Sequence, residues 1–329
     1  MRDAGLSVLR AGPLVTVQDR GRYGSARFGV ARSGPMDWIA HALALHLAGC
    51  GVDDPAIEAG PGGVKLRCNA GPVRIGIAGW GGRAVIAGEG GTRHVACPAR
   101  VTLRPDETID LRPLAGNWVV LAAHGFDVGA PVLDSWATNS RTGLGPAKPA
   151  EGARYPCVVN DAGPDLLYLD PLEGADPDVP IRILAAPQTH LFDAASLHAL
   201  VSQPFTVDAK RDRQGGRLTG PSLVAPGGHD IVSDALVEGA MQVPGDGQPI
   251  VLTADCAPTG GYPKIAVVTR VDLPRIVRAG TGDKVRFTWS DPARARSALA
   301  ALEDTVADPV PRRRTRFPEP LVAAMRPRR

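Results

Sequence analysis

The sequence lacks the features that define several large classes of protein. Its five cysteines are odd in number, widely spaced and without a C-x-x-C pair, which predicts reduced thiols in a cytoplasmic protein, not a disulfide framework or a zinc site. No apolar run approaches the roughly 20 residues of a membrane helix, and residues 1–5 lead into no apolar stretch, so neither a membrane span nor a signal peptide is expected.

Aromatic residues and positive surface charge are also scarce. Aromatic side chains make up 5% of the sequence, which leaves little for stacking on nucleic-acid bases. The formal net charge is +3, but residues 312–329 hold seven arginines and one glutamate, so the rest of the chain is near −3. A nucleic-acid partner is therefore not expected. We predict that 312–329 is a basic, disordered tail; the alternative is a docking arm for an acidic partner.

The common motifs for nucleotides, metals and nucleophiles are absent. There is no G-x-x-x-x-G-K-[ST] phosphate loop, no H-E-x-x-H pair and no G-x-S-x-G elbow. His41 and His46 are five residues apart on one expected helix and cannot share a metal from one face, so no metal site is predicted. No lysine lies between methionines as in biotin-carrying domains, and no covalent cofactor is expected. The glycines at 79–82 are expected to form a hairpin turn.

Glycine and proline, by contrast, are abundant. The sequence has 39 glycines and 31 prolines among its 329 residues. Together they make up roughly a fifth of the chain, against a usual share of about 12%. Without a collagen-like period, this excess predicts turns between many short strands, expected at residues 73–78, 84–87, 101–103, 118–123, 166–169, 181–185, 250–253, 265–269 and 285–289. Three helices are expected: one with Pro35 in its first turn, one from Asp193 to about Val201, and one from Asp291 to about Val306.

A polar segment at 173–180, with two prolines and a glycine, is the best candidate linker. It predicts two β-rich domains, residues 1–178 and 179–311. We expect each to close as a barrel or a sandwich, because many short strands must hide their edges. The fold class is therefore mainly β with a few short helices.

Two segments carry the chemistry. The first, 12–37, is rich in glycine, as in a loop whose backbone approaches a ligand or a neighbouring strand. Its polar side chains are Gln18, Asp19, Arg22, Ser33 and Asp37. A helix N-terminus near residue 34 would add N–H groups suited to a carboxylate. The alternative is that the aspartate at 19 and the arginine at 22 pair simply to hold the loop.

The second segment, 241–264, contains a strand that ends at Asp255, and Thr259-Gly260-Gly261-Tyr262-Pro263-Lys264 follows. Two glycines after a strand can present successive N–H groups as an anion nest. Hydroxyls, a cation and a carboxylate beside them could grip and polarise an amide or a carboxylate. The alternative is a glycine turn with a salt-bridged lysine.

Taken together, these segments resemble a known family. Thr16-Val17-Gln18-Asp19-x-Gly21-Arg22-x-Gly24, with Ser33-Gly34-x-Met36-Asp37, is similar to the N-terminal signature of the allophanate-hydrolase subunit 2 and biotin-dependent carboxyltransferase family. Its C-terminal signature is matched by residues 239–244, 247–250 and 259–265, and 217–221 and 282–287 also fit. The similarity spans about residues 6 to 290.

The resemblance implies two cyclophilin-like β-barrel domains related by a pseudo-two-fold. It also implies a subunit of an ATP-dependent amidohydrolase, namely the C-type component of 5-oxoprolinase, which opens 5-oxoproline to glutamate with separate A- and B-type subunits. ATP would be used at a partner subunit. The alternatives are a biotin-dependent carboxyltransferase of the urea-carboxylase type, or a non-enzymatic antagonist of a kinase-inhibitor partner.

The resemblance also assigns roles to residues. Asp255, Lys264 and Tyr262 are the expected catalytic residues. The expected substrate-binding residues are Gln18, Asp19, Arg22, Ser33, Asp37, Arg217, Gln242, Thr259, Gly260 and Gly261. Several positions depart from the family pattern, among them 124–125, 134–138, 143–149, 211–213 and 256–258, and these departures leave the substrate open. Burial of the expected residues in separate, unconnected ion pairs would argue against a shared cleft.

Overall fold

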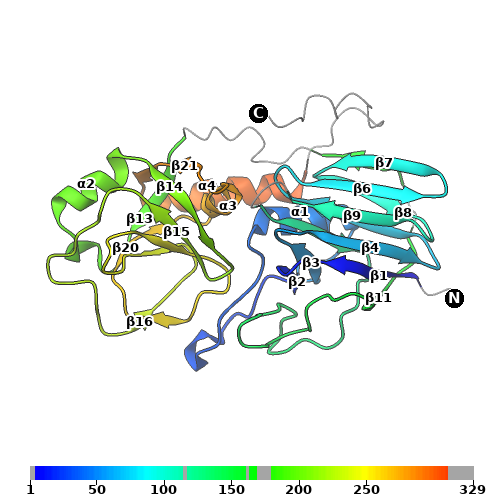
Figure 1. Cartoon of the computed structure of the whole chain (residues 1–329), viewed down its shortest axis with the longest axis horizontal. Helices are drawn as coiled ribbons and strands as arrows, with labels where there is room; N and C mark the ends of the chain where they lie inside the picture. The colour runs from blue at the N-terminus through cyan, green and yellow to red at the C-terminus, as the bar shows by residue number, and fades with distance from the viewer. Residues whose placement is uncertain (1–3, 114–116, 161–162, 169–178, 310–329) are drawn as a thin grey trace.

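The computed structural model describes residues 4–113, 117–160, 163–168 and 179–309. The described chain is mainly β with a few helices, arranged as two bodies in Figure 1. Most of the expected linker, 173–178, and the expected tail, 312–329, lie outside the described residues, so the domain boundary at residue 178 stays a prediction. No helix among the described residues combines the length and hydropathy of a membrane span.

Two six-stranded sheets make up the N-terminal body, on the right of Figure 1. The first has the order β11-β1-β4-β9-β6-β7, with β1 (Ala4–Ala11), β4 (Val64–Asn69), β6 (Arg83–Gly88), β7 (Gly91–Ala96), β9 (Thr108–Arg112) and β11 (Arg154–Cys157). The second has the order β12-β8-β5-β10-β3-β2, with β2 (Val15–Gln18), β3 (Ala56–Ala59), β5 (Val73–Ala78), β8 (Ala99–Leu103), β10 (Val119–Ala123) and β12 (Leu166–Leu167). All their pairings are antiparallel.

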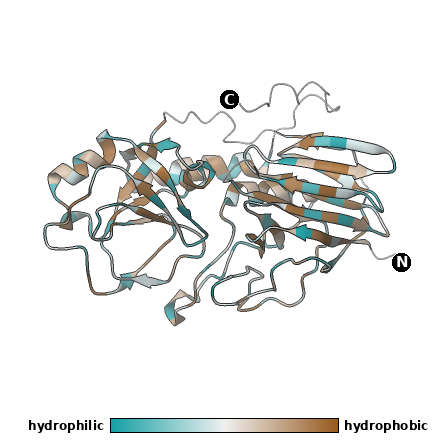
Figure 2. Ribbon diagram, in the orientation of Figure 1, coloured by the Kyte–Doolittle hydropathy of each residue, from teal (hydrophilic) through white to brown (hydrophobic). Residues whose placement is uncertain are grey.

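The core of this body lies between the two sheets. Alternate side chains of each strand point into it, for example Leu6 and Val8 of β1 and Ile75 and Ile77 of β5. Figure 2 shows the resulting alternation of hydrophobic and hydrophilic residues along the strands. Residues 79–82, expected as a hairpin turn, instead carry the chain from β5 in one sheet to β6 in the other. That prediction was wrong because local glycine content does not specify which strands pair.

Helix α1 (Trp38–Ala48) covers the outer face of the second sheet and makes β5 buried on both faces. The helix approaches closely at Gly76, where an added Cβ would lie 2.0 Å from the Ala44 carbonyl oxygen. The N-cap is Asp37, which accepts a hydrogen bond from the Ala40 N–H. The helix therefore begins three residues later than expected, and Pro35 is outside its first turn.

An eight-stranded sheet that is nearly closed into a barrel forms the C-terminal body, on the left of Figure 1. Its order is β21-β14-β15-β18-β17-β20-β13-β22, with β13 (Ile181–Ala185), β14 (Phe205–Arg211), β15 (Gly215–Thr219), β17 (Ala240–Gln242), β18 (Ile250–Leu252), β20 (Lys264–Val268), β21 (Lys284–Val285) and β22 (Phe287–Trp289). The expected strand 285–289 breaks at Arg286. One part pairs with β14 and the other with β13, so this break joins the two edges of the sheet.

The helices and a short ribbon complete this body. The ribbon pairs β16 (Asp234–Ala235) with β19 (Thr259–Gly260). Helices α2 (Ala194–Ser202) and α4 (Pro292–Ala307) confirm two expectations, with Asp193 and Asp291 as N-caps, whereas α3 (Leu273–Arg278) was not expected. Leu302 and Val306 of α4 pack against α1 of the other body.

Candidate functional site

The five predicted binding residues of the N-terminal loop, between β2 and α1, are all buried. Asp19 accepts hydrogen bonds from the Gly21 N–H at 2.7 Å and from the Ser135 hydroxyl at 2.7 Å. Arg22 donates to the carbonyl oxygens of Val132 and Ala137. Burial lowers the pKa of Arg22 from its usual value, against the opposing effect of nearby carboxylates. The two charged residues thus fasten the loop to segment 132–138 and form no direct ion pair with each other.

Gln18, Ser33 and Asp37 hold the rest of the loop. Gln18 accepts a hydrogen bond from the Gly34 N–H at 3.1 Å and donates to the Thr138 carbonyl at 2.9 Å. Ser33 accepts one from the side chain of Asn139. Asp37 caps α1 and pairs with Arg278 of α3 at 2.6 Å. The N–H groups of Gly34, Met36 and Ala40 are therefore occupied by Gln18, Glu58 and Asp37, so the expected carboxylate site at residue 34 is not open.

A buried arginine connects the two bodies. Arg213 forms a bidentate pair with Asp255, at 2.9 and 3.1 Å, and a second ion pair with Glu58 of β3. It also donates to the Gly34 carbonyl oxygen at 2.6 Å, and its guanidinium lies 5.7 Å from the ring centroid of Trp118. All three charged side chains are at most 4% exposed. Asp255 is therefore brought to the N-terminal loop, but its carboxylate is held by Arg213, which the sequence indicated only as part of the segment 211–213 that departs from the family pattern.

The remaining predicted residues, except Arg217, gather at the ribbon of β16 and β19. Lys264 pairs with Asp234 at 2.8 Å and holds the pKa of that carboxyl at about 2. The Asp234 carboxylate also accepts a hydrogen bond from Gln188 at 3.0 Å. The Gln242 amide donates to the backbone carbonyl of Tyr262, a residue that is 41% exposed. These groups form a second polar cluster in the C-terminal body.

The glycine pair does not have the geometry that the sequence suggested. Gly260 lies in β19, opposite Asp234 of β16, and Thr259 is exposed beside it. Neither Gly260 nor Gly261 adopts a positive φ, which one residue of an anion nest requires. The expected nest is therefore not formed. Arg217 lies apart from both clusters, in an ion pair with Asp246.

The predicted residues thus divide into two groups. Asp255 and the loop residues belong to the buried network around Arg213, and Lys264, Gln242 and Tyr262 belong to the ribbon. The ion pairs of Asp255 and Lys264 share no member among the described residues, which argues against one cleft that contains both. Their catalytic roles stay predictions. The described residues also contain no group of three His, Cys, Asp or Glu side chains that could hold a metal ion.

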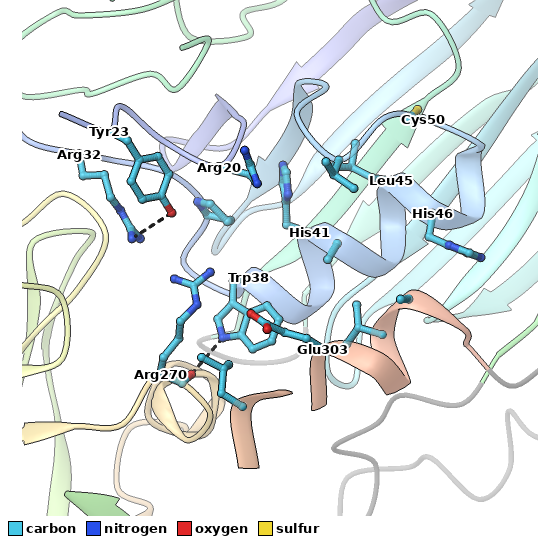
Figure 3. Close-up of a pocket in the computed structure, with 16 residues that line it drawn as sticks. Arg20, Tyr23, Arg32, Trp38, His41, Leu45, His46, Cys50, Arg270 and Glu303 are labelled. Atoms are coloured by element: carbon cyan, nitrogen blue, oxygen red, sulfur yellow. Dashed lines mark hydrogen bonds between the residues drawn. The ribbon is translucent and has the colours of Figure 1, made fainter. Parts of the chain in front are cut away.

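A hollow of about 630 Å³ opens where the N-terminal loop, α1, α4 and the segment after β20 meet, and we call it the α1–α4 hollow (Figure 3). Its lining residues are Arg20, Tyr23, Arg32, Pro35, Trp38, His41, Ala42, Leu45, His46, Cys50, Val52, Arg270, Leu299, Glu303, Val306 and Ala307. This volume is in the range of small-molecule sites. None of the predicted site residues lines it.

The loop that the sequence singled out nevertheless supplies part of this hollow. Arg20, Tyr23 and Arg32 lie between the buried polar residues of the loop and face the hollow in Figure 3. Arg270, from the C-terminal body, was missed because it follows a strand with no motif around it. Trp38 was missed as the first residue of an apolar helix. The signal available for Arg20, Tyr23 and Arg32 was their place beside the polar residues that the sequence singled out in this loop.

Comparison with known proteins agrees with this architecture. A family model described as carboxyltransferase domain, subdomain A and B, matches residues 28–289. The chain is 30% identical over 309 residues to the C subunit of 5-oxoprolinase from Escherichia coli (strain K12), and the match covers 91% of this chain and 94% of that one. The crystal structure of TTHA0988 matches 87% of this chain and 56% of that chain, with a TM-score of 0.76 and 30% identity.

A more distant structure has the same fold. The urea carboxylase of Kluyveromyces lactis superposes on 93% of this chain and 29% of that one, with a TM-score of 0.80 and 22% identity. The family match agrees with the fold, which combines the two sheets of the N-terminal body with the nearly closed C-terminal sheet. The chain belongs to the carboxyltransferase-domain family with subdomains A and B.

Proposed function

We propose that this chain is the C-type component of an ATP-dependent 5-oxoprolinase, which hydrolyses the cyclic amide of 5-oxoproline to glutamate with separate A- and B-type subunits. The observation that carries the proposal is the 30% identity to the E. coli 5-oxoprolinase component over nearly the whole length of both chains. The sequence has no phosphate loop, so we assign the ATP chemistry to a partner subunit.

The structure suggests a different role for each group of predicted residues. The Arg213 network fixes the N-terminal loop against the C-terminal body, and Asp255 acts there as a positioning residue. Lys264 and Tyr262 lie at the ribbon, where the lysine carries a positive charge beside the partly exposed Asp234. We propose that Lys264 takes part in the reaction and that Tyr262 contributes its exposed hydroxyl, as the family resemblance implies.

The test is glutamate release from 5-oxoproline and ATP by this chain with its cognate A and B subunits. We expect activity to require the chain. Lys264→Met should reduce kcat, whereas Arg67→Met, which removes an exposed ion pair with Asp106 away from both clusters, should leave kcat near the wild-type value. Hydrolysis at full rate without this chain would contradict the proposal.

The second candidate is carboxyl transfer, which the family model and the likeness to urea carboxylase favour. The cofactor would then be biotin on a separate protein. The α1–α4 hollow fits such a group in size and in its mixture of apolar and arginine walls, and Trp38 and Arg270 would contact it. Binding of free biotin to the wild-type chain, absent in Trp38→Ala, together with no dependence of 5-oxoproline hydrolysis on this chain, would favour this alternative.

A further inference from the structure

Exposed apolar side chains gather on one side of the molecule, where three segments meet. The segments are the N-terminal loop with its short helical turn η1 (Ala26–Phe28), the turn at 132–135, and the ribbon of β16 and β19 with its flanking residues. Half of the 14 exposed large hydrophobic side chains among the described residues belong to them, namely Tyr23, Phe28, Val132, Leu133, Val232, Val237 and Tyr262. We call this surface the loop–ribbon face, and Figure 1 shows the blue N-terminal loop and β16 along the same lower edge of the view. An apolar surface that faces solvent in the free chain indicates an interaction site.

Contacts between the three segments show that these side chains form one surface. Arg32 of the N-terminal loop pairs with Glu238, which follows Val237 on the ribbon side. Arg22 of the same loop donates to the carbonyl oxygen of Val132 at 3.0 Å. The N-terminal loop therefore contacts both the ribbon side and the turn at 132–135, and its exposed apolar side chains continue those of both neighbours.

The turn at 132–135 holds a leucine in a backbone conformation that leucine disfavours. Leu133 and Asp134 have φ angles of 52° and 56°, in the left-handed region that favours glycine and asparagine. The turn is closed by the Val132 N–H, which donates to the Ser135 carbonyl oxygen at 2.9 Å. Leu133 is nevertheless 51% exposed, so packing within the free chain does not explain why this position carries a leucine. A strained and exposed apolar residue indicates contact with another molecule.

The loop side of the face has the composition of a protein-binding surface. The guanidinium of Arg27 lies 4.7 Å from the ring centroid of Phe28, and that of Arg32 lies 5.3 Å from the ring centroid of Tyr23. Aromatic and arginine side chains contribute much of the binding energy in protein interfaces. Arg27 is exposed and forms no ion pair with the described residues, so an acidic side chain of a partner can pair with it.

The ribbon side of the face carries the Lys264–Asp234 pair. The side chain of Asp234, which lies in sequence between Val232 and Val237, is 45% exposed, whereas that of Lys264 is 3% exposed. Under the proposed function, Lys264 takes part in the reaction while ATP is used at a partner subunit. Both can act on one substrate molecule only if the ATP-using subunit comes within reach of this pair. The exposed apolar side chains lie beside that approach.

We propose that the loop–ribbon face is the docking surface for the partner subunit that uses ATP. That subunit presents an apolar surface to Phe28, Leu133 and Val232 and an acidic group to Arg27. Docking there brings its nucleotide site beside the ribbon. The choice of this partner rests on the proposed function, whereas the docking surface itself follows from the exposed side chains.

Isothermal titration calorimetry of the intact chain with each cognate subunit separately tests the surface. Titration of each subunit with ATP first identifies the one that binds the nucleotide. We expect Phe28→Ala and Leu133→Asn each to raise the Kd for that subunit at least tenfold, since each loses an apolar contact buried in the complex. Leu133→Asn should not lower the Tm of the free chain, because asparagine tolerates the left-handed conformation, so the weaker binding cannot be ascribed to unfolding.

A matched pair of valines provides the control. Val232→Ser, at the most exposed position of the face, should also raise the Kd. Val179→Ser should leave it unchanged, because Val179 is 51% exposed but lies outside the face, where its carbonyl oxygen accepts a hydrogen bond from Arg275 of α3.

Three results would overturn the proposal. The first is that the wild-type chain does not bind the ATP-using subunit, or that the face variants bind it with the wild-type Kd. The second is that the face variants weaken only the binding of the subunit that does not use ATP. The third is that the chain alone is a dimer in sedimentation equilibrium and Leu133→Asn makes it a monomer, since the face would then join two copies of this chain.

The reconstituted assembly separates this inference from the proposed function. If 5-oxoproline hydrolysis requires the chain but Phe28→Ala and Leu133→Asn bind the ATP-using subunit as the wild type does, the inference fails and the proposed function stands. If these variants lose binding of that subunit but hydrolysis does not require the chain, the docking surface stands and the proposed function fails.

Discussion

Substitution of Arg213 by methionine tests the connection between the two bodies. The change leaves the carboxylates of Glu58 and Asp255 buried without their shared cation, and it removes the donor to the Gly34 carbonyl oxygen. Loss of one partner from a buried ion pair costs about 3–5 kcal/mol, because the remaining charge stays desolvated. We expect a loss of this size in the free energy of unfolding, measured by urea denaturation at pH 8 with circular dichroism.

Two further variants make this prediction specific. Arg67→Met removes an exposed ion pair with Asp106, so it should cost less than about 1 kcal/mol. The triple variant Glu58→Gln, Arg213→Met and Asp255→Asn removes every charge of the cluster and should recover part of the stability that Arg213→Met loses. The reasoning is refuted if Arg213→Met and Arg67→Met unfold at the same urea concentration, since the buried carboxylates would then cost nothing.

Three more predictions concern single sites. Burial raises the pKa of Glu58 to about 7 from an ordinary 4.5, so the folded state binds this proton more tightly than the unfolded state does. The free energy of unfolding should therefore fall as the pH rises from 4.5 through 7. Urea unfolding across this range should show that the free energy of unfolding of Glu58→Gln depends less on pH than that of the wild type. Gly76→Val forces a side chain against the Ala44 carbonyl oxygen and should destabilise by about 1–3 kcal/mol, seen as a lower Tm than for Gly90→Val, whose surroundings are open. Burial raises the thiol pKa of Cys157 and Cys256 to about 12, so a disulfide reagent at pH 8 should label them slowly in the folded chain and quickly in urea; fast labelling of the folded chain would contradict this.

The sequence predicts the strands well where a strand is bounded by turn residues and buried on both faces. Residues 73–78 are such a case and form β5 with the same bounds. It does not predict how strands pair, since β5 and β6 are neighbours in sequence but belong to different sheets. The prediction of one continuous strand over 285–289 was wrong for a related reason. The alternating pattern is present, but the break at Arg286 depends on the closure of the barrel, which no local pattern encodes.

The candidate site shows the same limit. The motif residues of the N-terminal loop were found from the sequence because polar groups between glycines are conspicuous, but their function was not determined by that pattern. Arg213 and Arg270 come from distant parts of the chain, and only the packed structure shows that one is enclosed by two carboxylates and the other faces a hollow with none within ion-pair distance among the described residues. The sequence identifies which side chains are polar, whereas the fold decides which of them form hydrogen bonds and ion pairs within the chain.

The N-terminal loop contains residues of the family signature, which shape the loop, and residues between the signature positions, which face the α1–α4 hollow. Gly21 has a φ of 93°, and an added Cβ there would lie 2.7 Å from the Ser33 carbonyl oxygen, so the two ends of the loop approach through a position that only glycine fits. Asp19 and Arg22 use their hydrogen bonds to hold that shape. Arg20, Tyr23 and Arg32 lie between these residues and line the α1–α4 hollow instead, so the side chains that shape the loop are not the ones that it presents to the hollow.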